Sequence, residues 1–383
     1  MRIGVVGAGH AGVEAAAVAA AAGAQVTIFS AERLLPYFRP RIVALAFGQV
    51  EGAAIQIHPA QWYQDRGIRL TLDAPVEAIS VRNLSITSRG REEVFDGIVL
   101  ATGARPIVPS FAASAVDRVL PLWTASHADV IRGSMKPGGT VAIVGGGAIG
   151  IEAALRAAQS GCRAVVVEKA SGLMSGRLAP QASGLLMERL QEKGIRILTG
   201  AGVDRAEARP GGVTLQLEGG TTIEDATAIL CIGARSDVGL AGRAGIETAA
   251  GIVVDSRLRS SVPNAFACGD VAEVGGVRGG TALDAVMQGR VAGGNVCAAA
   301  AGAASGLKEY IRSAGAVSLK AGDFELHIAG RVGWENCEVQ VLEGSAAGAC
   351  RLLLVQGGRI VGVQMVGTNK DFRQYEAQIA GVH

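Results

Sequence analysis

Two short stretches of the chain have the residue types and spacing that bind the diphosphate of a dinucleotide. Each is an apolar run followed by G-x-G-x-x-G, and the six glycines are Gly7, Gly9, Gly12, Gly145, Gly147 and Gly150. The first glycine permits a tight turn, the second lets the backbone approach the diphosphate, and the third lets a helix pack closely on a strand. The N-terminus of that helix offers unpaired N–H groups to the phosphates. Each stretch is therefore predicted to bind a phosphate-bearing cofactor.

The second stretch repeats the first. IGVVGAGHAGVE (3–14) and VAIVGGGAIGIE (141–152) correspond position by position, and VLATGARP (99–106) returns as ILCIGARS (229–236). One such motif would be weak evidence in a chain with 55 glycines. Two copies, each between an apolar run and an alanine-rich helix, predict two dinucleotide sites, one in each half. The alternative is a pair of structural glycine turns that bind nothing.

A carboxylate normally binds the ribose hydroxyls at the end of the second strand of such a unit. In the second copy that residue is Glu168, which ends the run RAVVVE. The corresponding position in the first copy is Ser30, so the first copy departs from the rule. We therefore expect either Ser30 or Glu32, two residues further on, to bind the ribose. The other interpretation of Glu32 is a solvated carboxylate in a turn.

Length and composition limit the classes of function. A chain of 383 residues suggests two or three domains, and its net charge of +2 gives no indication of binding to nucleic acid or to an anionic membrane. No signal-peptide pattern follows the apolar start, and the alanine-rich helix is too short to cross a bilayer, so we expect a cytoplasmic protein. The six cysteines form no C-x-x-C pair, and no cluster has metal-ligand spacing, so no metal site is expected.

The elements that must position the glycine motifs alternate between strands and helices. The first copy predicts a strand at 2–6, a helix at 11–22 and a strand at 25–29, and the second copy predicts the same order over 140–161 and 165–167. Short apolar runs between helices are typical of parallel strands covered on both faces. The fold class is therefore predicted as α/β, with two Rossmann-like three-layer domains.

The last part of the chain has a different pattern. From residue 317 the residues alternate as in antiparallel strands, and 351–367 is predicted to form a hairpin with Gly357 and Gly358 at its turn. Residues 370–380 are predicted to form a closing helix, with Phe372, Tyr375 and Ile379 on one face. Together these elements predict a small α+β domain at the C-terminal end.

The stretch LLPYFRPR (34–41) contains two prolines and cannot lie inside a strand. It resembles the flavin-proximal P-Y-x-R-P motif of ferredoxin-reductase-like flavoproteins, a family that includes NADH:rubredoxin reductases and the flavin portion of assimilatory nitrite reductases. Arg39 and Pro40 match the motif, and the resemblance implies that they lie along the isoalloxazine ring of FAD. The family often continues with a lysine near the flavin, where this chain has Ala44.

Two further FAD motifs of that family are present. Ala101, Thr102 and Gly103 match the second motif, and Gly269 and Asp270 match the third. The resemblance implies that these residues bind FAD and that the Asp270 carboxylate binds the ribityl chain.

The resemblance also assigns backbone contacts in the FAD half. Val76 stands where family members contact adenine through the backbone. Ala282 opens a helix predicted to reach about Ala301, and the resemblance implies a backbone N–H there that points at the flavin O2 edge, where the helix dipole stabilises a reduced ring.

In the second half the resemblance implies an NADH site. Glu152 matches the family glutamate beside the nicotinamide; without the lysine, its carboxylate must find another partner or show a raised pKa. Ala148 and Ile149, which open the helix, and Gly233, which ends the repeated strand, complete the predicted nucleotide-binding residues.

The resemblance covers the whole chain and predicts three domains. The FAD-binding domain would comprise 1–110 and 234–302, the NAD-binding domain 111–233, and the small C-terminal α+β domain 303–383. It implies an FAD-dependent NADH oxidoreductase. The chain has no cysteine before Cys162, so it lacks the cysteines that related disulfide reductases and NADH oxidases place after the first helix. Electrons must therefore leave the flavin directly.

The acceptor implied by the resemblance is a small iron–sulfur or rubredoxin-type carrier. Such carriers are typically acidic, and the flavin-side stretch offers Arg33, Arg39 and Arg41 to a rubredoxin or ferredoxin. Two alternatives stay open: a flavoprotein subunit that senses NADH without turnover, and an NADH-dependent reductase of a small molecule or of oxygen. The oligomeric state cannot be predicted from the sequence.

Overall fold

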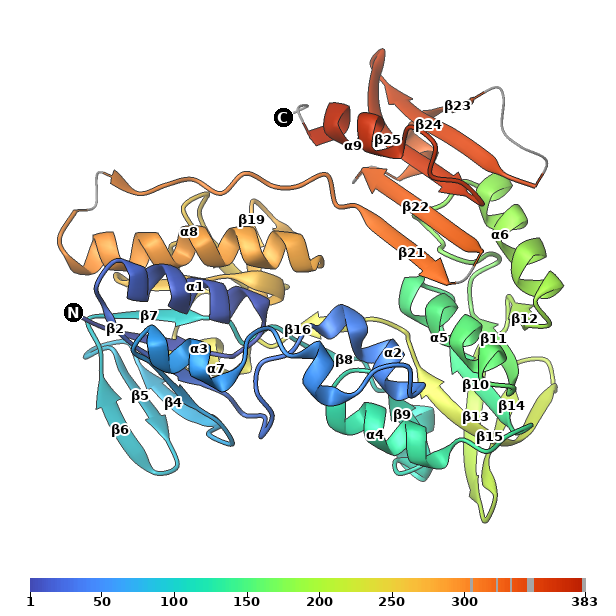
Figure 1. The fold of residues 1–383 in the computed structure, drawn as a ribbon, viewed down its shortest axis with the longest axis horizontal. Helices are drawn as coiled ribbons and strands as arrows, with labels where there is room; N and C mark the ends of the chain where they lie inside the picture. Colours follow the sequence, from blue (N-terminus) through green and yellow to red (C-terminus); the bar gives the residue numbers. More distant parts are fainter. Residues whose placement is uncertain (304–305, 322, 331–332, 343–347, 381–383) are drawn as a thin grey trace. The chain divides into compact units, whose positions relative to one another are not determined.

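The computed structural model describes residues 1–303, 306–321, 323–330, 333–342 and 348–380 (Figure 1). The chain forms two compact units. Unit 1 comprises Met1–Pro40, Gly52–Arg105 and Ala234–Ser313, and unit 2 comprises Arg41–Glu51, Pro106–Gly233 and Ala314–His383. Parts of the predicted C-terminal domain lie outside the described residues, namely 304–305, 322, 331–332, 343–347 and 381–383.

Unit 1 is built on a five-stranded parallel sheet. Its strands stand in the order β18, β7, β1, β2, β3, with the first strand of the chain at the centre. The bounds are Arg2–Val6 for β1, Gln25–Phe29 for β2, Ile68–Thr71 for β3, Gly97–Leu100 for β7 and Ala265–Ala267 for β18. Four of these strands, β1, β2, β7 and β18, are buried along nearly their whole length, which explains their continuous apolar runs, whereas the edge strand β3 is buried only at Ile68.

Helices and smaller sheets complete unit 1. The helices are α1 (His10–Ala21), α3 (Ala60–Asp65), α7 (Gly239–Arg243) and α8 (Ala282–Ala300). One antiparallel sheet contains β4 (Val76–Ser80), β5 (Ser85–Ser88) and β6 (Arg91–Val94). Another sheet contains β17 (Ile252–Val254), β19 (Ala272–Val274) and β20 (Val277–Arg278), and β8 (Ala104–Pro106) pairs with β16 (Ala234–Ser236).

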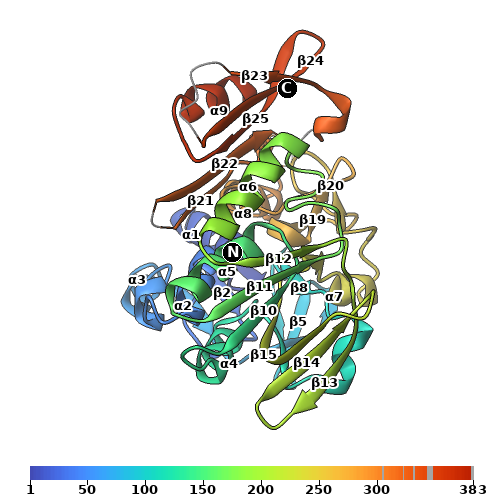
Figure 2. The ribbon, with the colours of Figure 1, turned by 90° about the vertical axis from the view of Figure 1, so that its right-hand side faces the viewer.

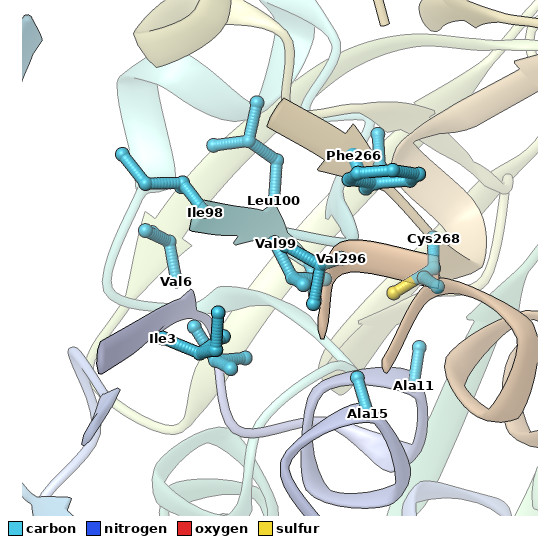
Figure 3. Close-up of a cluster of buried hydrophobic side chains, with 14 of the residues drawn as sticks. Ile3, Val6, Ala11, Ala15, Ile98, Val99, Leu100, Phe266, Cys268 and Val296 are labelled. Carbon is cyan, nitrogen blue, oxygen red and sulfur yellow. The ribbon is translucent and has the colours of Figure 1, made fainter. Parts of the chain in front are cut away.

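The helices α1 and α8 lie side by side (Figure 1) because their contact is made of small residues. A Cβ atom at Gly289 would lie 2.4 Å from the carbonyl oxygen of Ala11, and one at Gly293 would lie 2.3 Å from that of Ala15. Both glycines are therefore needed for the two backbones to approach. Val296 of α8 continues this contact into the buried core under the sheet (Figure 3).

Unit 2 repeats this arrangement with a larger sheet. Its strands stand in the order β12, β11, β10, β15, β14, β13 (Figure 2). The strand β9 also pairs with β15. As in unit 1, the strand before the glycine turn is parallel to both of its neighbours. The strands are β9 (Val119–Pro121), β10 (Thr140–Val144), β11 (Arg163–Glu168), β12 (Arg196–Thr199), β13 (Val203–Arg209), β14 (Gly212–Leu217) and β15 (Thr222–Leu230). The helices are α2 (Ile42–Ala46), α4 (Ala125–Ser134), α5 (Ala148–Gln159) and α6 (Pro180–Glu192).

The C-terminal part of unit 2 is a five-stranded antiparallel sheet with one helix. The strands are β21 (Val317–Ala321), β22 (Phe324–Gly330), β23 (Glu338–Val341), β24 (Cys350–Gln356) and β25 (Arg359–Val366), and the helix is α9 (Phe372–Ala380). The predicted hairpin is confirmed, because β24 and β25 pair across Gly357 and Gly358, which both have positive φ angles. Phe372 and Ile379 of α9 pack into the core of this sheet, as the helical pattern predicted.

The predicted fold class is confirmed: two Rossmann-like sheets and a C-terminal antiparallel sheet, the sheet of unit 2 carrying the antiparallel strands β13 and β14 beside its parallel part. Element ends shift by small amounts. The first glycine helix, predicted at 11–22, runs from His10 to Ala21, because Gly9 provides its N-cap. Among the helices of the described chain, none is both long and apolar enough to cross a membrane.

Candidate dinucleotide-binding sites

The first glycine turn joins β1 to α1 in unit 1. Gly7 has a φ of 106°, which a residue with a side chain rarely adopts. A Cβ at Gly12 would lie 2.0 Å from the carbonyl oxygen of Gly7, so this glycine allows the helix to sit directly on the turn. At Gly9, in contrast, no described atom lies within 4 Å of an added Cβ. The backbone is therefore open to a ligand at the position where the motif predicts the diphosphate.

The second turn, in unit 2, has the same geometry. Gly145 has a φ of 112°, and a Cβ at Gly150 would lie 2.0 Å from its carbonyl oxygen. The space around an added Cβ at Gly147 is also empty of described atoms within 4 Å. Both turns thus present an open N-cap glycine at the start of a helix, which fits a dinucleotide diphosphate.

His10, which the sequence analysis did not select, is the first residue of α1. Its ring meets Phe38 edge to face, with 4.8 Å between the ring centroids. Burial, and then the charge of Arg39, lower the pKa of His10 from 6.5 to about 4, so the imidazole is neutral at pH 7. Its Nε2 atom is buried and has no hydrogen-bond partner among the described residues. An orphaned polar atom of this kind costs about 1–3 kcal/mol, and a bound cofactor can satisfy it.

The two candidates for the ribose of the first copy have different surroundings. Ser30 is buried, and its hydroxyl accepts a hydrogen bond from the backbone N–H of Glu32 at 3.2 Å. The Glu32 carboxylate accepts hydrogen bonds from the Tyr37 hydroxyl at 2.6 Å and from Nη2 of Arg39 at 2.7 Å. Ser30 therefore shapes the turn, whereas Glu32 is held by the P-Y-x-R-P segment. Which of them binds the ribose stays a prediction.

Arg39 connects several predicted site residues of unit 1. It lies in a 3-10 turn with Pro40, which is exposed, and its guanidinium carbon lies 5.5 Å from the centre of the Tyr37 ring. Its positive charge adds to the lowering of the His10 pKa by burial, and it opposes the rise that burial causes in the pKa of Asp270. A cation within reach of these groups is suited to hold a phosphate-bearing cofactor.

The second and third FAD motifs meet the first glycine turn. A Cβ at Gly7 would lie 2.1 Å from the carbonyl oxygen of Ala101, so these segments are in backbone contact. Thr102 donates a hydrogen bond to the carbonyl oxygen of Asp237 at 2.9 Å, and Gly103 has a φ of 69°. These contacts place the A-T-G segment at the end of β7, beside the turn.

The third motif forms a 3-10 turn over Gly269–Val271. A Cβ at Gly269 would lie 2.9 Å from the side chain of Ala11 in α1, so this turn also lies against the first glycine helix. Burial raises the pKa of Asp270, while Arg39 opposes that effect. Val76 begins β4, and Ala282 begins α8, as the sequence predicted for that helix.

Glu168 stands at the end of β11, next to the second glycine turn. Its carboxylate accepts hydrogen bonds from the backbone N–H of Gly146 at 2.6 Å and of Ala170 at 2.7 Å. The side chain is therefore fixed at the position where the motif expects the ribose of the second dinucleotide. Ile149 is exposed on the first turn of α5, and Gly233 has a φ of 94°.

Glu152 lies on α5, and its expected lysine partner is replaced by Ala44. The helix α2, which carries Ala44, packs against α5. The partner of Glu152 is Arg156, one turn further along α5, with 3.7 Å between Nη2 and Oε1. Burial raises the pKa of Glu152, and Arg156 opposes this rise. The sequence left this partner open, although the spacing of four residues on a helix was visible.

Two glycine turns with adjacent carboxylates define a protein that holds two dinucleotides. Residues 1–289 match the pyridine nucleotide-disulphide oxidoreductase family, and the chain belongs to this family.

Its relatives include a probable ferredoxin reductase of Castellaniella defragrans, 34% identical over 278 residues, which are 70% of this chain and 67% of the relative. A rubredoxin-NAD(+) reductase of Ectopseudomonas oleovorans is 31% identical over 277 residues, which are 71% of this chain and 72% of that relative.

Solved structures show the same fold. A ferredoxin reductase for the CYP199A2 system from Rhodopseudomonas palustris matches with a TM-score of 0.88 and 26% identity, covering 97% of this chain and 92% of that one. Putidaredoxin reductase, in a covalent complex with putidaredoxin, matches with a TM-score of 0.88 and 24% identity over 99% of this chain and 93% of that one.

Proposed function

We propose that the protein is an FAD-dependent NADH oxidoreductase that passes electrons to a small electron-carrier protein. The observation that carries this proposal is the pair of glycine turns with the same geometry, each open at its N-cap glycine. The family assigns FAD and NADH as the two cofactors. Relatives named ferredoxin reductase and rubredoxin-NAD(+) reductase support a small iron–sulfur or rubredoxin-type carrier as the acceptor.

The residues of unit 1 fit FAD. Bound FAD supplies the redox chemistry, because it accepts two electrons from NADH and can release them one at a time. The open Gly9 would admit the diphosphate, Arg39 would lie along the isoalloxazine ring, and the orphaned His10 nitrogen would gain a partner. Asp270 would bind the ribityl hydroxyls, and Glu32 or Ser30 the ribose.

The residues of unit 2 fit NADH. The N-terminus of α5 would hold the diphosphate above Gly147 and Gly150, and the fixed carboxylate of Glu168 would accept the ribose hydroxyls. Glu152 would lie beside the nicotinamide, with Arg156 holding its charge. No residue here needs to donate or remove a proton, so the contribution of the protein is alignment.

Thiols are poorly placed to relay electrons. All six cysteines are free in the structure, and the first along the chain is Cys162. Burial raises the pKa of Cys231 and of Cys268 to about 12, so both stay protonated and unreactive at neutral pH. We infer that electrons pass from FAD to the acceptor without a disulfide intermediate.

This inference predicts the electron capacity of the protein. An anaerobic titration is expected to reduce the FAD fully with one equivalent of NADH, because FAD is the single redox centre. The measurement is the bleaching of flavin absorbance against added NADH. Consumption of two equivalents per FAD before NADH accumulates would show a second redox centre and contradict the thiol argument.

The carrier assignment is tested by stopped-flow oxidation of the NADH-reduced protein. We expect rubredoxin or ferredoxin to reoxidise the flavin at least tenfold faster than air does, an estimate based on steered association of small carriers. The salt dependence should be only severalfold, because Arg33 pairs with Asp73 and Arg39 pairs with Glu32, which reduces the charge available for steering.

Three results separate the alternatives. Reoxidation by air faster than by either carrier would favour a reductase of oxygen, and turnover with a small dye but with neither carrier would favour a small-molecule acceptor. Failure of all acceptors, with NADH still bound, would favour the sensing subunit.

We also propose a cytoplasmic location, which the six free thiols support, because disulfides are rare in reducing compartments. The domain division is proposed as 1–110 with 234–302 for FAD, 111–233 for NADH and 303–383 for the C-terminal domain.

A further inference from the structure

A buried carboxylate lies in the first turn of α8, and the known motifs do not use it. Asp284 is 1% exposed, and three groups donate hydrogen bonds to it. Its Oδ1 atom accepts from the Tyr310 hydroxyl at 2.7 Å and from the backbone N–H of Ser313 at 3.1 Å, and its Oδ2 atom accepts from the Thr281 hydroxyl at 3.1 Å. A carboxyl group that accepts these hydrogen bonds at a helix N-terminus is best satisfied when it is ionised.

Two of the three donors to Asp284 come from a segment to which no site residue was assigned from the sequence. Tyr310 and Ser313 belong to the stretch that follows α8, and Tyr310 is itself buried. The backbone N–H of Tyr310 donates to the carbonyl oxygen of Ser256 at 2.8 Å, which fixes the stretch to unit 1. The stretch is therefore held at Tyr310 through both its hydroxyl and its backbone N–H.

The same cluster reaches the turn that carries Asp270. Gln288, one turn further along α8, accepts a hydrogen bond from the backbone N–H of Gly269 at 2.8 Å and also interacts with the Tyr310 hydroxyl. The charge of Asp284 acts on Asp270 and helps to raise its pKa, after the larger effect of burial. A continuous chain of contacts thus runs from Tyr310 to the third FAD motif.

We propose that Asp284 is a positioning residue for FAD, held by Tyr310 and Ser313, which fixes the start of α8 and the Gly269–Asp270 turn and carries a negative charge in the unit that binds FAD. This inference rests on the proposed function, because it requires FAD in unit 1. In this proposal the 307–313 stretch stabilises the FAD site indirectly, through the hydrogen bonds that Tyr310 and Ser313 donate to Asp284.

The charge of Asp284 and the hydrogen bonds of Tyr310 have different consequences for bound FAD. A fixed negative charge opposes the arrival of electrons and keeps the reduction potential of FAD low, which favours transfer onward to a carrier. The hydrogen bonds of Tyr310 hold the N-terminus of α8, so their loss lets the turn move and FAD leave faster. Two substitutions separate these effects.

Asp284→Asn keeps the size and the acceptor oxygen but removes the charge. We expect the midpoint potential of bound FAD to become less negative, while the rate of FAD dissociation changes less than about threefold. Tyr310→Phe keeps the charge but removes one hydrogen bond. We expect FAD to dissociate about tenfold faster, with a smaller change in potential.

The experiment uses the FAD-loaded protein. The dissociation rate is measured from the rise in FAD fluorescence after dilution, and the potential from equilibration with reference dyes. Tyr63→Phe is the matched control, because the Tyr63 hydroxyl is buried in unit 1 and has no hydrogen-bond partner in the described chain. Asp65→Asn, at an exposed position of α3, is the control for loss of a charge.

Each outcome decides the inference. A shifted potential in Asp284→Asn and faster FAD release in Tyr310→Phe, with neither change in the controls, support it. Lower thermal stability with unchanged potential, flavin spectrum and release rate would show a structural role alone and overturn it. A starting protein that takes up no FAD would instead overturn the proposed function.

Discussion

A Gly150→Ala variant is expected to keep its FAD and to be reduced by NADH about 100-fold more slowly than the unchanged protein. Its Cβ would lie 2.0 Å from the carbonyl oxygen of Gly145 and 3.3 Å from Ile143. Because one of these contacts is backbone, the start of α5 must move away from β10. That movement displaces the N–H groups offered to the diphosphate of NADH, and a binding loss of about 2.8 kcal/mol corresponds to about 100-fold.

The equivalent change in unit 1 should weaken the binding of FAD rather than the reaction with NADH. In Gly12→Ala the new Cβ would lie 2.0 Å from the carbonyl oxygen of Gly7, so the start of α1 must move. We expect this variant to be purified with less than about one tenth of the normal FAD content, by the same estimate. The pair of variants therefore assigns one cofactor to each turn.

Two control glycines show whether any alanine substitution has this effect. Gly52 lies in unit 1 and Gly184 in unit 2, and no described atom lies within 4 Å of a Cβ built at either. Gly52→Ala and Gly184→Ala should match the unchanged protein in FAD content, rate of reduction and melting temperature. Normal reduction of Gly150→Ala by NADH would mean that the second turn does not bind NADH.

The turns were predictable because their requirements are local. Gly7 and Gly145 need a positive φ, and Gly12 and Gly150 need room for the turn that precedes them by only five residues. Such constraints leave a fixed spacing in the sequence. The buried strands were predictable for a related reason, because a strand covered on both faces must be apolar throughout.

Contacts between residues far apart in the chain leave no fixed spacing in the sequence, so they could not be predicted. Asp284 meets Tyr310 across 26 residues, and an aspartate in the first turn of a helix is ordinarily explained as a capping residue. His10 could not be selected from the sequence, because its ring packs against Phe38 and its pKa is lowered first by burial and then by the charge of Arg39. These groups became candidates only when the fold placed them together.

The pairing of Arg39 shows that basic residues counted in a sequence need not offer a free positive charge to a partner. The sequence suggested three arginines available to an acidic carrier. In the structure Arg39 bonds to Glu32 at 2.7 Å, and Arg33 lies 3.4 Å from Asp73. The count of basic residues therefore overstates the positive potential of this segment, and steering of a carrier by these two arginines should be modest.

A preference for NADH over NADPH is expected to depend on Glu168. Its carboxylate is fixed by the N–H groups of Gly146 and Ala170, so it cannot turn away from a bound ribose. An added 2′-phosphate would meet this charge and lose the hydrogen bonds that the ribose hydroxyls make. The neighbouring cation Lys169 lies 3.9 Å from Glu218, which reduces its ability to compensate. We expect kcat/KM to favour NADH by about 100-fold.

Replacing Glu168 by Gln removes the charge and keeps the shape. The preference in Glu168→Gln should fall to about tenfold or less, because repulsion of the 2′-phosphate is lost while one acceptor oxygen remains. The measurement is kcat/KM for both cofactors with a dye acceptor. Glu188→Gln, an exposed carboxylate on α6, is the control and should leave the preference unchanged. An unchanged preference in Glu168→Gln would place the ribose elsewhere and remove this residue from the NADH site.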